Sequence, residues 1–335
     1  MPIRASEASA PTRIDLAGGT LDIWPICQLI EDAVTVNLAI RLTARARVSP
    51  RRDRRLEVVS VDRGRRVLHD LPLRASAFRG ALSWPVRLAH AFAPDVPLTL
   101  VCSAEAPAGA GLGGSSSLGI AIGAALARAT GERLTKDGLL QRVMNLETRE
   151  IGVPTGNQDY LAALWGGLGA YHHTQDGVMR RPIRIPDELD TRLVLAYTGQ
   201  PRQSGFSNWD MFRRYVENDR ATVRHMAAIA RLARAMRDAL TAGDLDETGR
   251  LLGEEGRLRY SLAPSVATSA LRAADEAARR SGAWGAKVCG AGGGGCMVAF
   301  AREGKREAVA EAITATGARV LRAAAARRGV AVSEP

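Results

Sequence analysis

The segment Pro107-Ala-Gly-Ala-Gly-Leu-Gly-Gly-Ser-Ser-Ser117 lies between a short apolar strand pattern and a helical pattern that starts near Leu118. Glycine lets the backbone turn its N–H groups inward and approach an anion closely. Serine directly before a helix is typical of an N-terminal cap. Because a helix N-terminus carries free N–H groups and about half a positive charge, the segment predicts a site for nucleotide phosphates. The alternative is an ordinary glycine-rich turn before a capped helix.

This loop differs from two other glycine-rich motifs. No Lys-Ser or Lys-Thr pair closes it, as in a Walker A loop, and no serine lies between singly spaced glycines, as in a nucleophile elbow. A second glycine-rich segment, Gly290-Ala-Gly-Gly-Gly-Gly295, precedes another apolar strand pattern. Because glycine loses the most backbone entropy on folding, two such loops in one chain favour close approach of the backbone to a ligand.

Composition limits the class of protein. The chain has 335 residues, and 46% of them are hydrophobic, which is enough for two ordinary cores. The net charge is +11, but the arginines are scattered among acidic residues, and aromatic residues make up only 4%. A basic groove with aromatic stacking positions is not indicated, so we expect no nucleic acid partner.

Cysteine spacing and hydropathy predict a soluble cytoplasmic protein. The cysteines form no C-x-x-C pair and have no histidine at zinc-finger spacing; they are Cys27, Cys102, Cys289 and Cys296. We expect them to be small buried residues in a reducing compartment. The N-terminus has no apolar signal region, and no run approaches the roughly 20 apolar residues of a membrane span. No membrane association is expected.

Hydrophobic periodicity predicts an α+β protein with two domains, residues 1–185 and 186–335. Pro182 and Pro186 mark the boundary. Only the first eight residues and the last few have the composition of disordered ends. Strands are expected at 33–40, 42–48, 56–61, 96–103, 168–172, 193–197 and 296–301, and helices at 116–129, 136–150, 156–165, 210–242, 245–260, 268–280 and 305–325.

Three motifs resemble those of the GHMP kinases, the family named for galactokinase, homoserine kinase, mevalonate kinase and phosphomevalonate kinase. They are Ala10-Pro-Thr-Arg-Ile-Asp-Leu-Ala-Gly-Gly-Thr-Leu-Asp22, the 107–117 loop, and Gly285-Ala-Lys-Val-Cys-Gly-Ala-Gly-Gly-Gly-Gly-Cys296. Their order along almost the whole chain makes the resemblance specific. Arg13, the 18–22 segment and Asn157-Gln158-Asp159 are most similar to the sugar-kinase branch, in particular to heptose 7-phosphate 1-kinases and galactokinase-like proteins.

The resemblance implies a fold and an activity. An N-terminal domain like domain 2 of ribosomal protein S5 would pack against a ferredoxin-like C-terminal domain, with the active site between them. ATP and Mg²⁺ would be the cofactors, and the substrate would be a sugar or sugar phosphate, phosphorylated at the anomeric hydroxyl. The alternatives are a kinase for an isoprenoid or amino alcohol, and a catalytically silent ligand sensor. The oligomeric state stays open, with a homodimer among the alternatives.

The resemblance also implies roles for single residues. Asp159 would accept the proton of the substrate hydroxyl, and Arg13 would stabilise negative charge beside it. Glu147 and Ser115 would bind Mg²⁺, with Glu150 and Ser116 as the alternative ligands. Phosphate contacts are expected from Pro107, Gly109, Gly111, Leu112, Gly113, Gly114, Ser115, Ser116 and Ser117, and substrate contacts from Gly18, Gly19, Thr20, Asp22, Gly292 and Gly293.

The sequence departs from the family pattern at two of these places. Gly114 stands where the family loop usually has its first serine. Tyr160 follows Asp159 where the sugar-kinase branch has a glutamine, so an amide that could face the substrate is missing. Asp22 could contact sugar hydroxyls or simply shape the turn after Gly-Gly-Thr. The identity of the substrate therefore stays open.

Overall fold

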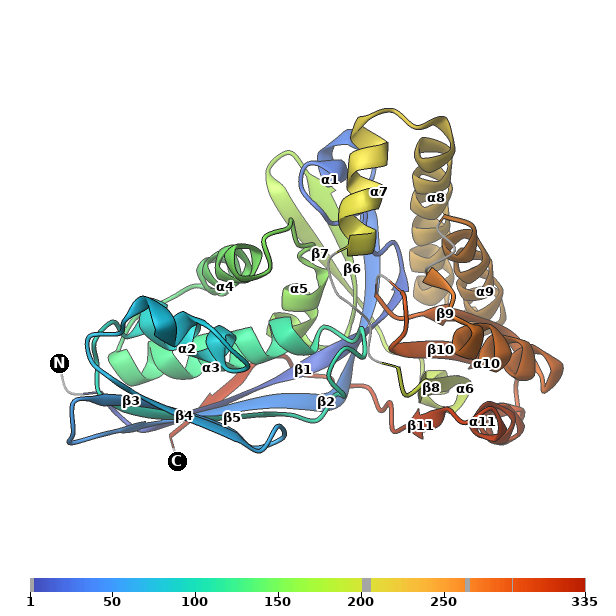
Figure 1. Cartoon of the computed structure of the whole chain (residues 1–335). Helices are drawn as coiled ribbons and strands as arrows, with labels where there is room; N and C mark the ends of the chain where they lie inside the picture. Colours follow the sequence, from blue (N-terminus) through green and yellow to red (C-terminus); the bar gives the residue numbers. More distant parts are fainter. Residues whose placement is uncertain (1–2, 201–205, 263–265, 291, 335) are drawn as a thin grey trace.

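The computed structural model describes residues 3–200, 206–262, 266–290 and 292–334, which form two β-sheets flanked by helices (Figure 1). The first sheet has the order β12-β1-β2-β5-β3-β4, and β6 and β7 extend it beside β2. Only β3 and β5 pair in parallel within it. Its strands are β1 (Ser6–Ala17), β2 (Val34–Pro50), β3 (Arg55–Ser60), β4 (Arg65–Asp70), β5 (Leu98–Ala104), β6 (Leu168–Thr174), β7 (Gly177–Ile183) and β12 (Ala331–Ser333).

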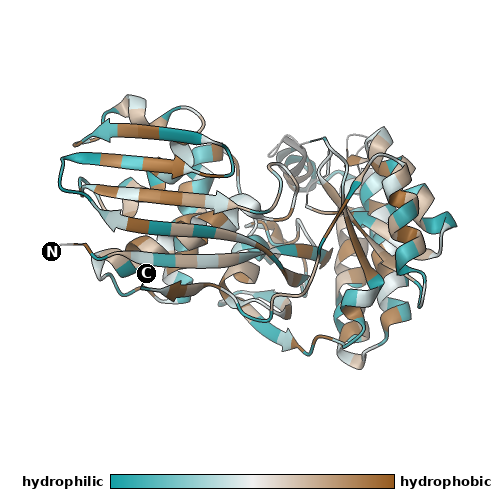
Figure 2. Cartoon of the chain, turned by 90° about the horizontal axis from the view of Figure 1, so that it is seen from below, coloured by the Kyte–Doolittle hydropathy of each residue, from teal (hydrophilic) through white to brown (hydrophobic). Residues whose placement is uncertain are grey.

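Helices cover one face of the first sheet (Figure 1). They are α2 (Ser83–Phe92), α3 (Gly114–Thr130), α4 (Lys136–Ile151) and α5 (Gln158–Trp165), with the 3₁₀ helix η1 (Ala75–Phe78) beside them. Val48 and Leu100 of the sheet join Ile120 of α3 in one buried apolar cluster. Figure 2 shows the strands from the uncovered side. Within β2, the exposed Arg45 and Arg47 alternate with buried residues. This alternation places the first core on one side only.

The second sheet has the order β11-β8-β10-β9, with all neighbours antiparallel. Val298 and Phe300 of β10 pack with one set of helices, whereas Met297 and Ala299 pack with the other. Because both faces are covered, every residue of β10 is buried, and its sequence is a continuous apolar run. The elements are β8 (Leu193–Tyr197), β9 (Ala283–Val288), β10 (Cys296–Ala301), β11 (Arg319–Leu321), α8 (Arg220–Ala242) and α9 (Leu245–Leu262) on one face, and α10 (Ser269–Arg280) and α11 (Arg306–Ala315) on the other.

A shared core and a returning chain segment join the two halves. Ile14 of β1, Leu195 of β8 and Val298 of β10 lie in the same buried apolar cluster. After β11 the chain runs back along the first sheet, where the Ala326 N–H donates to the Ala39 carbonyl oxygen over 2.8 Å. β12 then pairs with β1, so both ends of the chain lie at the same side of the molecule (Figure 1). The remaining helices of the described chain are two single turns, α1 (Ile26–Leu29) and α6 (Leu189–Arg192), and the longer α7 (Phe206–Val216).

Several predicted elements needed correction. The strands at 33–40 and 42–48 are the single strand β2, and β1 begins at Ser6 within the segment expected to be disordered. The helix at 210–242 is two helices, because Asn218 adopts a φ of +58° and the Asp219 carboxylate caps α8 through the Thr222 N–H. The helix at 305–325 ends at Ala315, before Gly317 with a φ of +89°, and the chain continues as β11. In the described part of the chain, no helix has the length and apolar character to cross a membrane.

Candidate active site

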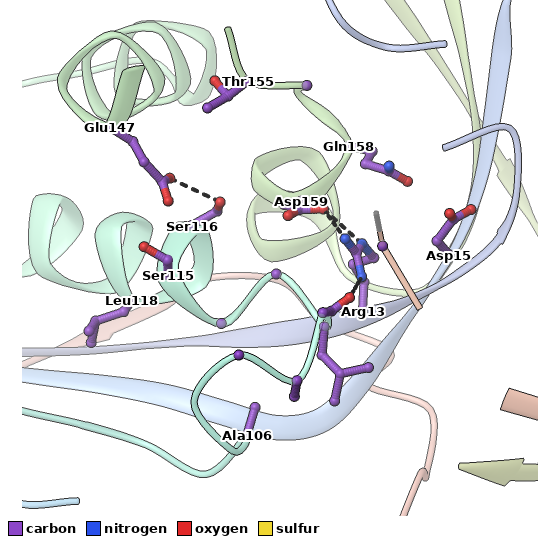
Figure 3. A pocket seen from close by; sticks show the side chains of 18 of the residues that line it. Arg13, Asp15, Ala106, Ser115, Ser116, Leu118, Glu147, Thr155, Gln158 and Asp159 are labelled. Atoms are coloured by element: carbon purple, nitrogen blue, oxygen red, sulfur yellow. Dashed lines mark hydrogen bonds and ion pairs between the residues drawn. The ribbon is translucent and has the colours of Figure 1, made fainter. Parts of the chain in front are cut away.

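A cavity of about 270 Å³ lies where the two halves meet. The 107–116 loop forms one wall, residues 153–159 form another, and the 13–23 segment forms the floor. Glu147 of α4 and the Asp62–Arg63 turn also line it, as do Arg259 and Gly290 from the second half. Figure 3 shows side chains from β1, α3, α4 and α5 pointing into this space. The cavity therefore brings together segments that are far apart in the sequence.

Helix α3 begins at the glycine loop, and no side chain caps it. Its N-cap is Gly113 with a φ of +72°, and its first residue is Gly114. A Cβ atom at Gly111 would lie 2.3 Å from the Cys289 carbonyl oxygen, and one at Gly113 would lie 3.0 Å from Asp159 Cγ. Glycine is therefore required at both positions. The uncapped helix end borders the cavity, which is the arrangement that holds phosphate groups.

The second glycine segment supports the first one from behind. The Cys296 N–H donates to the Ala110 carbonyl oxygen over 2.8 Å. A Cβ atom at Gly295 would lie 2.7 Å from that same oxygen. The two loops are therefore in backbone contact, and the small size of Gly295 permits it. Of the described residues in this segment, Gly290 lines the cavity.

Arg13 and Asp159 form an ion pair at the floor of the cavity (Figure 3). Arg13 Nε donates to Asp159 Oδ1 over 2.8 Å, and Arg13 Nη1 donates to the Gly111 carbonyl oxygen over 2.7 Å. Burial opposes the charge of Arg13, but the carboxylates of Asp159 and Asp15 raise its pKa above the ordinary value. The Asp159 side chain keeps 22% of its surface exposed. One carboxylate is thus held in place and still open to a ligand.

Glu147 of α4 lies beside the start of α3. Its Oε2 atom accepts hydrogen bonds from Ser116 Oγ, over 3.0 Å, and from the Tyr160 hydroxyl. Burial raises the pKa of Glu147, although hydrogen bonds from Tyr160, Ser115 and Ser116 oppose this shift. Tyr160 therefore faces Glu147 and the core. The argument from the missing amide had assumed that this position faces the substrate.

The surroundings of Glu147 fit a magnesium ion bound to a nucleotide. Mg²⁺ in proteins uses one or two carboxylates and completes its shell with phosphate oxygens and water. Among the residues that the structure describes, no group of three or more His, Cys, Asp or Glu could hold a metal by itself. Ser115 is exposed to the cavity next to the buried Glu147. The alternative ligand Glu150 is engaged elsewhere, because it accepts from Ser83 Oγ and from Arg87 Nε.

The other end of the cavity is rich in hydrogen-bond acceptors. Asp22 Oδ2 accepts from the Gln158 N–H over 2.9 Å, and burial raises the pKa of Asp22 to about 6. Asp15 Oδ1 and Gln158 Oε1 are buried without a hydrogen-bond partner in the described structure. Leaving buried polar atoms unsatisfied is costly. A ligand with several hydroxyl donors would satisfy them.

Four buried charged side chains, Asp15, Glu255, Arg259 and Lys287, lie beneath this end. Lys287 Nζ lies 2.8 Å from Asp15 Oδ2 and 3.4 Å from Glu255 Oε1. Arg259 Nε donates to Glu255 Oε1 over 2.9 Å, and its Nη2 donates to the Gly19 carbonyl oxygen over 2.5 Å. Burial opposes the charge of Asp15, but Lys287 and Arg259 lower its pKa below the ordinary value. This charged cluster fixes the 18–19 turn to the second half of the chain.

Comparison with known proteins decides the family. Residues 80–167 match the N-terminal domain of GHMP kinases, and residues 236–319 match the GHMP kinase C-terminal domain. A mevalonate kinase from Pyrococcus horikoshii is 30% identical over 244 residues, which cover 72% of this chain and 69% of that protein. The chain belongs to the GHMP kinase family.

Other GHMP kinases resemble this family member in sequence or in structure. The D-glycero-alpha-D-manno-heptose 7-phosphate kinase of Campylobacter jejuni is 28% identical over 201 residues; the match covers 58% of this chain and only 59% of the relative's own length. A crystal structure of a D-glycero-D-manno-heptose 1-phosphate kinase from Bacteroides thetaiotaomicron gives a TM-score of 0.77 at 22% identity, covering 98% of this chain and 99% of that one. The likeness confirms the predicted two-domain GHMP kinase fold with mixed α and β structure.

The GHMP kinase fold brings most of the predicted site residues to this one cavity: Arg13, Gly19, Thr20, Asp22, Pro107, Gly109, Gly111, Leu112, Gly113, Gly114, Ser115, Ser116, Glu147 and Asp159. Gly18, Ser117, Gly292 and Gly293 do not line it. The Ser117 hydroxyl donates to the Pro11 carbonyl oxygen over 2.8 Å, so it ties α3 to β1. The predicted capping of α3 by serine is wrong, because these hydroxyls bond to other segments and Gly113 is the N-cap.

Several residues that line the cavity were not predicted, and three of them, Asp15, Gln158 and Arg259, lie at the end with the buried acceptors. A signal existed for Asp15, because residues two apart on a strand point to the same face, and Asp15 follows Arg13 at that spacing. Gln158 lies next to Asp159 in a quoted motif. Arg259 had no local signal, since its helix joins the site only through the tertiary fold.

Proposed function

We propose that this chain transfers the γ-phosphoryl group of ATP to a hydroxyl group of a sugar or sugar phosphate. The observation that carries the proposal is the position of Asp159. Its carboxylate is held by Arg13 in a cavity that has an uncapped helix N-terminus on one side and buried acceptors on the other. A phosphate donor and an alcohol would therefore meet at Asp159.

Asp159 would act as the proton acceptor. The substrate hydroxyl gives its proton to the carboxylate while its oxygen forms a bond to the γ-phosphorus. The bond from that phosphorus to the oxygen bridging the β- and γ-phosphates breaks, and ADP leaves with its electron pair. Arg13 keeps the carboxylate oriented toward the substrate through its bond to Oδ1. The N–H groups at the start of α3 stabilise the charge on the phosphates.

Glu147 and Ser115 are the residues that would hold Mg²⁺, which when bound neutralises charge on the transferring phosphates. Both serines are hydrogen-bond partners of Glu147, but Ser115 is exposed to the cavity, whereas Ser116 is buried and donates to Glu147 Oε2. We therefore propose Ser115 as a ligand and Ser116 as a support for Glu147.

Mevalonate kinases also match this chain, so the substrate class needs its own argument. Mevalonate carries a carboxylate, which requires a free positive charge. Three arginines line the cavity. At the end with the buried acceptors, Arg13 is bound to Asp159, and Arg259 is bound to Glu255 and to the Gly19 carbonyl oxygen. Arg63 belongs to the turn between β3 and β4, where it donates to the Ala81 carbonyl oxygen just before α2. Asp15, Asp22 and Gln158 instead offer oxygen atoms that accept hydrogen bonds. This balance favours a neutral part of the substrate that carries several hydroxyls.

The proposal is tested by incubating the purified chain with Mg²⁺-ATP and a panel of acceptors. The panel contains free sugars, sugar phosphates including heptose 7-phosphates, mevalonate and amino alcohols. ADP release measures turnover, and phosphorus NMR locates the new phosphate and shows whether it is at the anomeric carbon. We expect turnover with a sugar or sugar phosphate. Turnover with mevalonate alone, or with none of the acceptors, would contradict the proposal.

A further inference from the structure

Tyr160 is a buried residue that no step of the proposed reaction uses. It follows Asp159 on α5, but the two side chains point in different directions, since successive residues on a helix are rotated by about 100°. Asp159 lines the cavity, whereas Tyr160 is 1% exposed and packs in the core of the first domain. Its hydroxyl nevertheless reaches Glu147.

Two hydroxyl groups converge on a single oxygen of Glu147. Tyr160 donates to Oε2 from α5, and Ser116 donates to the same atom from α3, over 3.0 Å. Glu147 itself lies on α4 and is 7% exposed. Rotation of the carboxylate would break both bonds. Its other oxygen, Oε1, takes part in neither of them. Groups that hold a metal ligand in this way commonly change metal affinity 10–100-fold when they are removed.

We infer that Tyr160 is a positioning residue, which together with Ser116 holds Glu147 Oε2 so that Oε1 is presented to the divalent cation of the bound nucleotide. The inference rests on the proposed function, because it assigns Tyr160 to the same nucleotide site. It also links the two sides of the reaction, since neighbouring residues of α5 position the cation ligand and accept the substrate proton.

The test measures how strongly a divalent cation tightens nucleotide binding. Calorimetry gives the Kd of a non-hydrolysable ATP analogue with Mn²⁺ and with EDTA, and the ratio of the two values is the gain from the cation. Tyr160→Phe removes only the hydroxyl. We expect it to reduce the gain about 10-fold or more and to leave the metal-free Kd unchanged. If Tyr160 only supported the fold, its substitution would change the Kd with Mn²⁺ and the Kd with EDTA by the same factor, or would change neither.

Tyr171→Phe is the matched control. Tyr171 is also 1% exposed and lies in the same core cluster, but it belongs to β6 and does not line the cavity. The inference is overturned if Tyr160→Phe retains the wild-type gain, or if Tyr171→Phe loses as much of it. Should Tyr160→Phe fail to fold, Ser116→Ala approaches the same oxygen from the other side and is expected to reduce the gain as well.

A double-mutant cycle separates this inference from the proposed function. In a Glu147→Gln background, Tyr160→Phe is expected to leave the remaining gain unchanged, because the residue that it positions no longer carries a charge. An equal loss in both backgrounds would overturn the inference while the nucleotide site stands. A wild-type chain that binds no nucleotide with or without Mn²⁺ would instead remove the proposed function, and the inference with it.

Discussion

Lys287 Nζ lies 2.8 Å from Asp15 Oδ2, and both side chains are fully buried. Lys287 belongs to β9 of the second sheet, and Asp15 belongs to β1 of the first. The same ammonium group donates to the Asp15 carbonyl oxygen over 2.7 Å. This ion pair therefore connects the two halves of the chain directly beneath the cavity, through both a side chain and the backbone.

Lys287→Met is expected to destabilise the protein by about 3–5 kcal/mol, because it leaves two buried carboxylates with too little positive charge. Urea denaturation measures the free energy of unfolding. Lys305→Met is the control, since Lys305 is exposed and its loss should have little effect. Equal free energies of unfolding for the two variants would show that the charge of Lys287 does not stabilise the protein.

Asp159→Asn is expected to lower turnover by about 10²–10⁴-fold, because the amide keeps the size of the side chain but cannot accept the proton. The affinity for nucleotide should survive, since the glycine loop and α3 are untouched. Steady-state kinetics and calorimetry give the two quantities. Asp187→Asn, at an exposed site with a 79% exposed side chain, is the control. Unchanged turnover would remove Asp159 from the mechanism.

Gly111→Ala, in the loop before α3, and Gly131→Ala, at its C-terminal cap, form a matched pair. Both glycines have a φ of +77°, but a Cβ at Gly111 would meet the Cys289 carbonyl oxygen at 2.3 Å, and one at Gly131 would meet nothing within 4 Å. We expect Gly131→Ala to cost about 1–2 kcal/mol from backbone strain alone. Gly111→Ala should cost roughly 2–5 kcal/mol and also weaken nucleotide binding.

The contrast in nucleotide binding decides this prediction. Thermal denaturation ranks the stabilities, and titration with an ATP analogue compares the affinities of the two variants. Nucleotide affinity that is equal in Gly111→Ala and Gly131→Ala would show that the loop does not hold the phosphates.

The raised pKa of Asp22 predicts the sign of this residue's contribution to the pH dependence of stability. Its pKa rises from 3.8 to about 6 in the folded state, first because it is buried and then because Asp159 and Asp15 are near. Between these pH values Asp22 holds more protons in the native protein than in the unfolded chain, so the contribution of this residue to the free energy of unfolding falls as pH rises from about 4 to 6 and levels off above.

Asp22→Asn removes this titration and keeps an oxygen for the Gln158 N–H. The variant should therefore gain stability relative to wild type as pH rises, by up to about 3 kcal/mol between pH 4 and pH 7. Urea denaturation at pH 4, 5, 6 and 7 measures the difference. Parallel curves for the two proteins would contradict a raised pKa at this residue.

The glycine loops and the order of the motifs made much of the site predictable from the sequence. A continuous apolar run such as Cys296–Ala301 and a capped helix such as α4 carry their own local signals. β1 was missed because it begins with polar residues, contains Pro11, and is buried on both faces over its second half, so it shows no alternation. A single sequence reveals a strand through alternating polar and apolar residues or through a continuous apolar run, and β1 has neither.

Contacts between distant segments could not be predicted in the same way. The direction of the Tyr160 side chain depends on how α5 packs against α4, because Glu147 reaches it only in the folded chain. Nothing in the sequence around Lys287 predicted that it would be buried and paired with Asp15, because this contact forms only when β9 packs near β1. Burial of a charge is decided by tertiary packing, and a single sequence does not report it.

The return of the chain from β11 to β12 has a mechanical consequence. The backbone passes between the two halves once before β8 and again after β11, and the second passage is fastened by hydrogen bonds such as that from the Arg41 N–H to the Ala324 carbonyl oxygen over 2.9 Å. This second connection adds to the shared apolar core and to the buried Lys287–Asp15 pair, all of which would have to be disrupted for the halves to separate widely. We therefore expect ligand exchange at this cleft to depend mainly on local shifts of the surrounding loops.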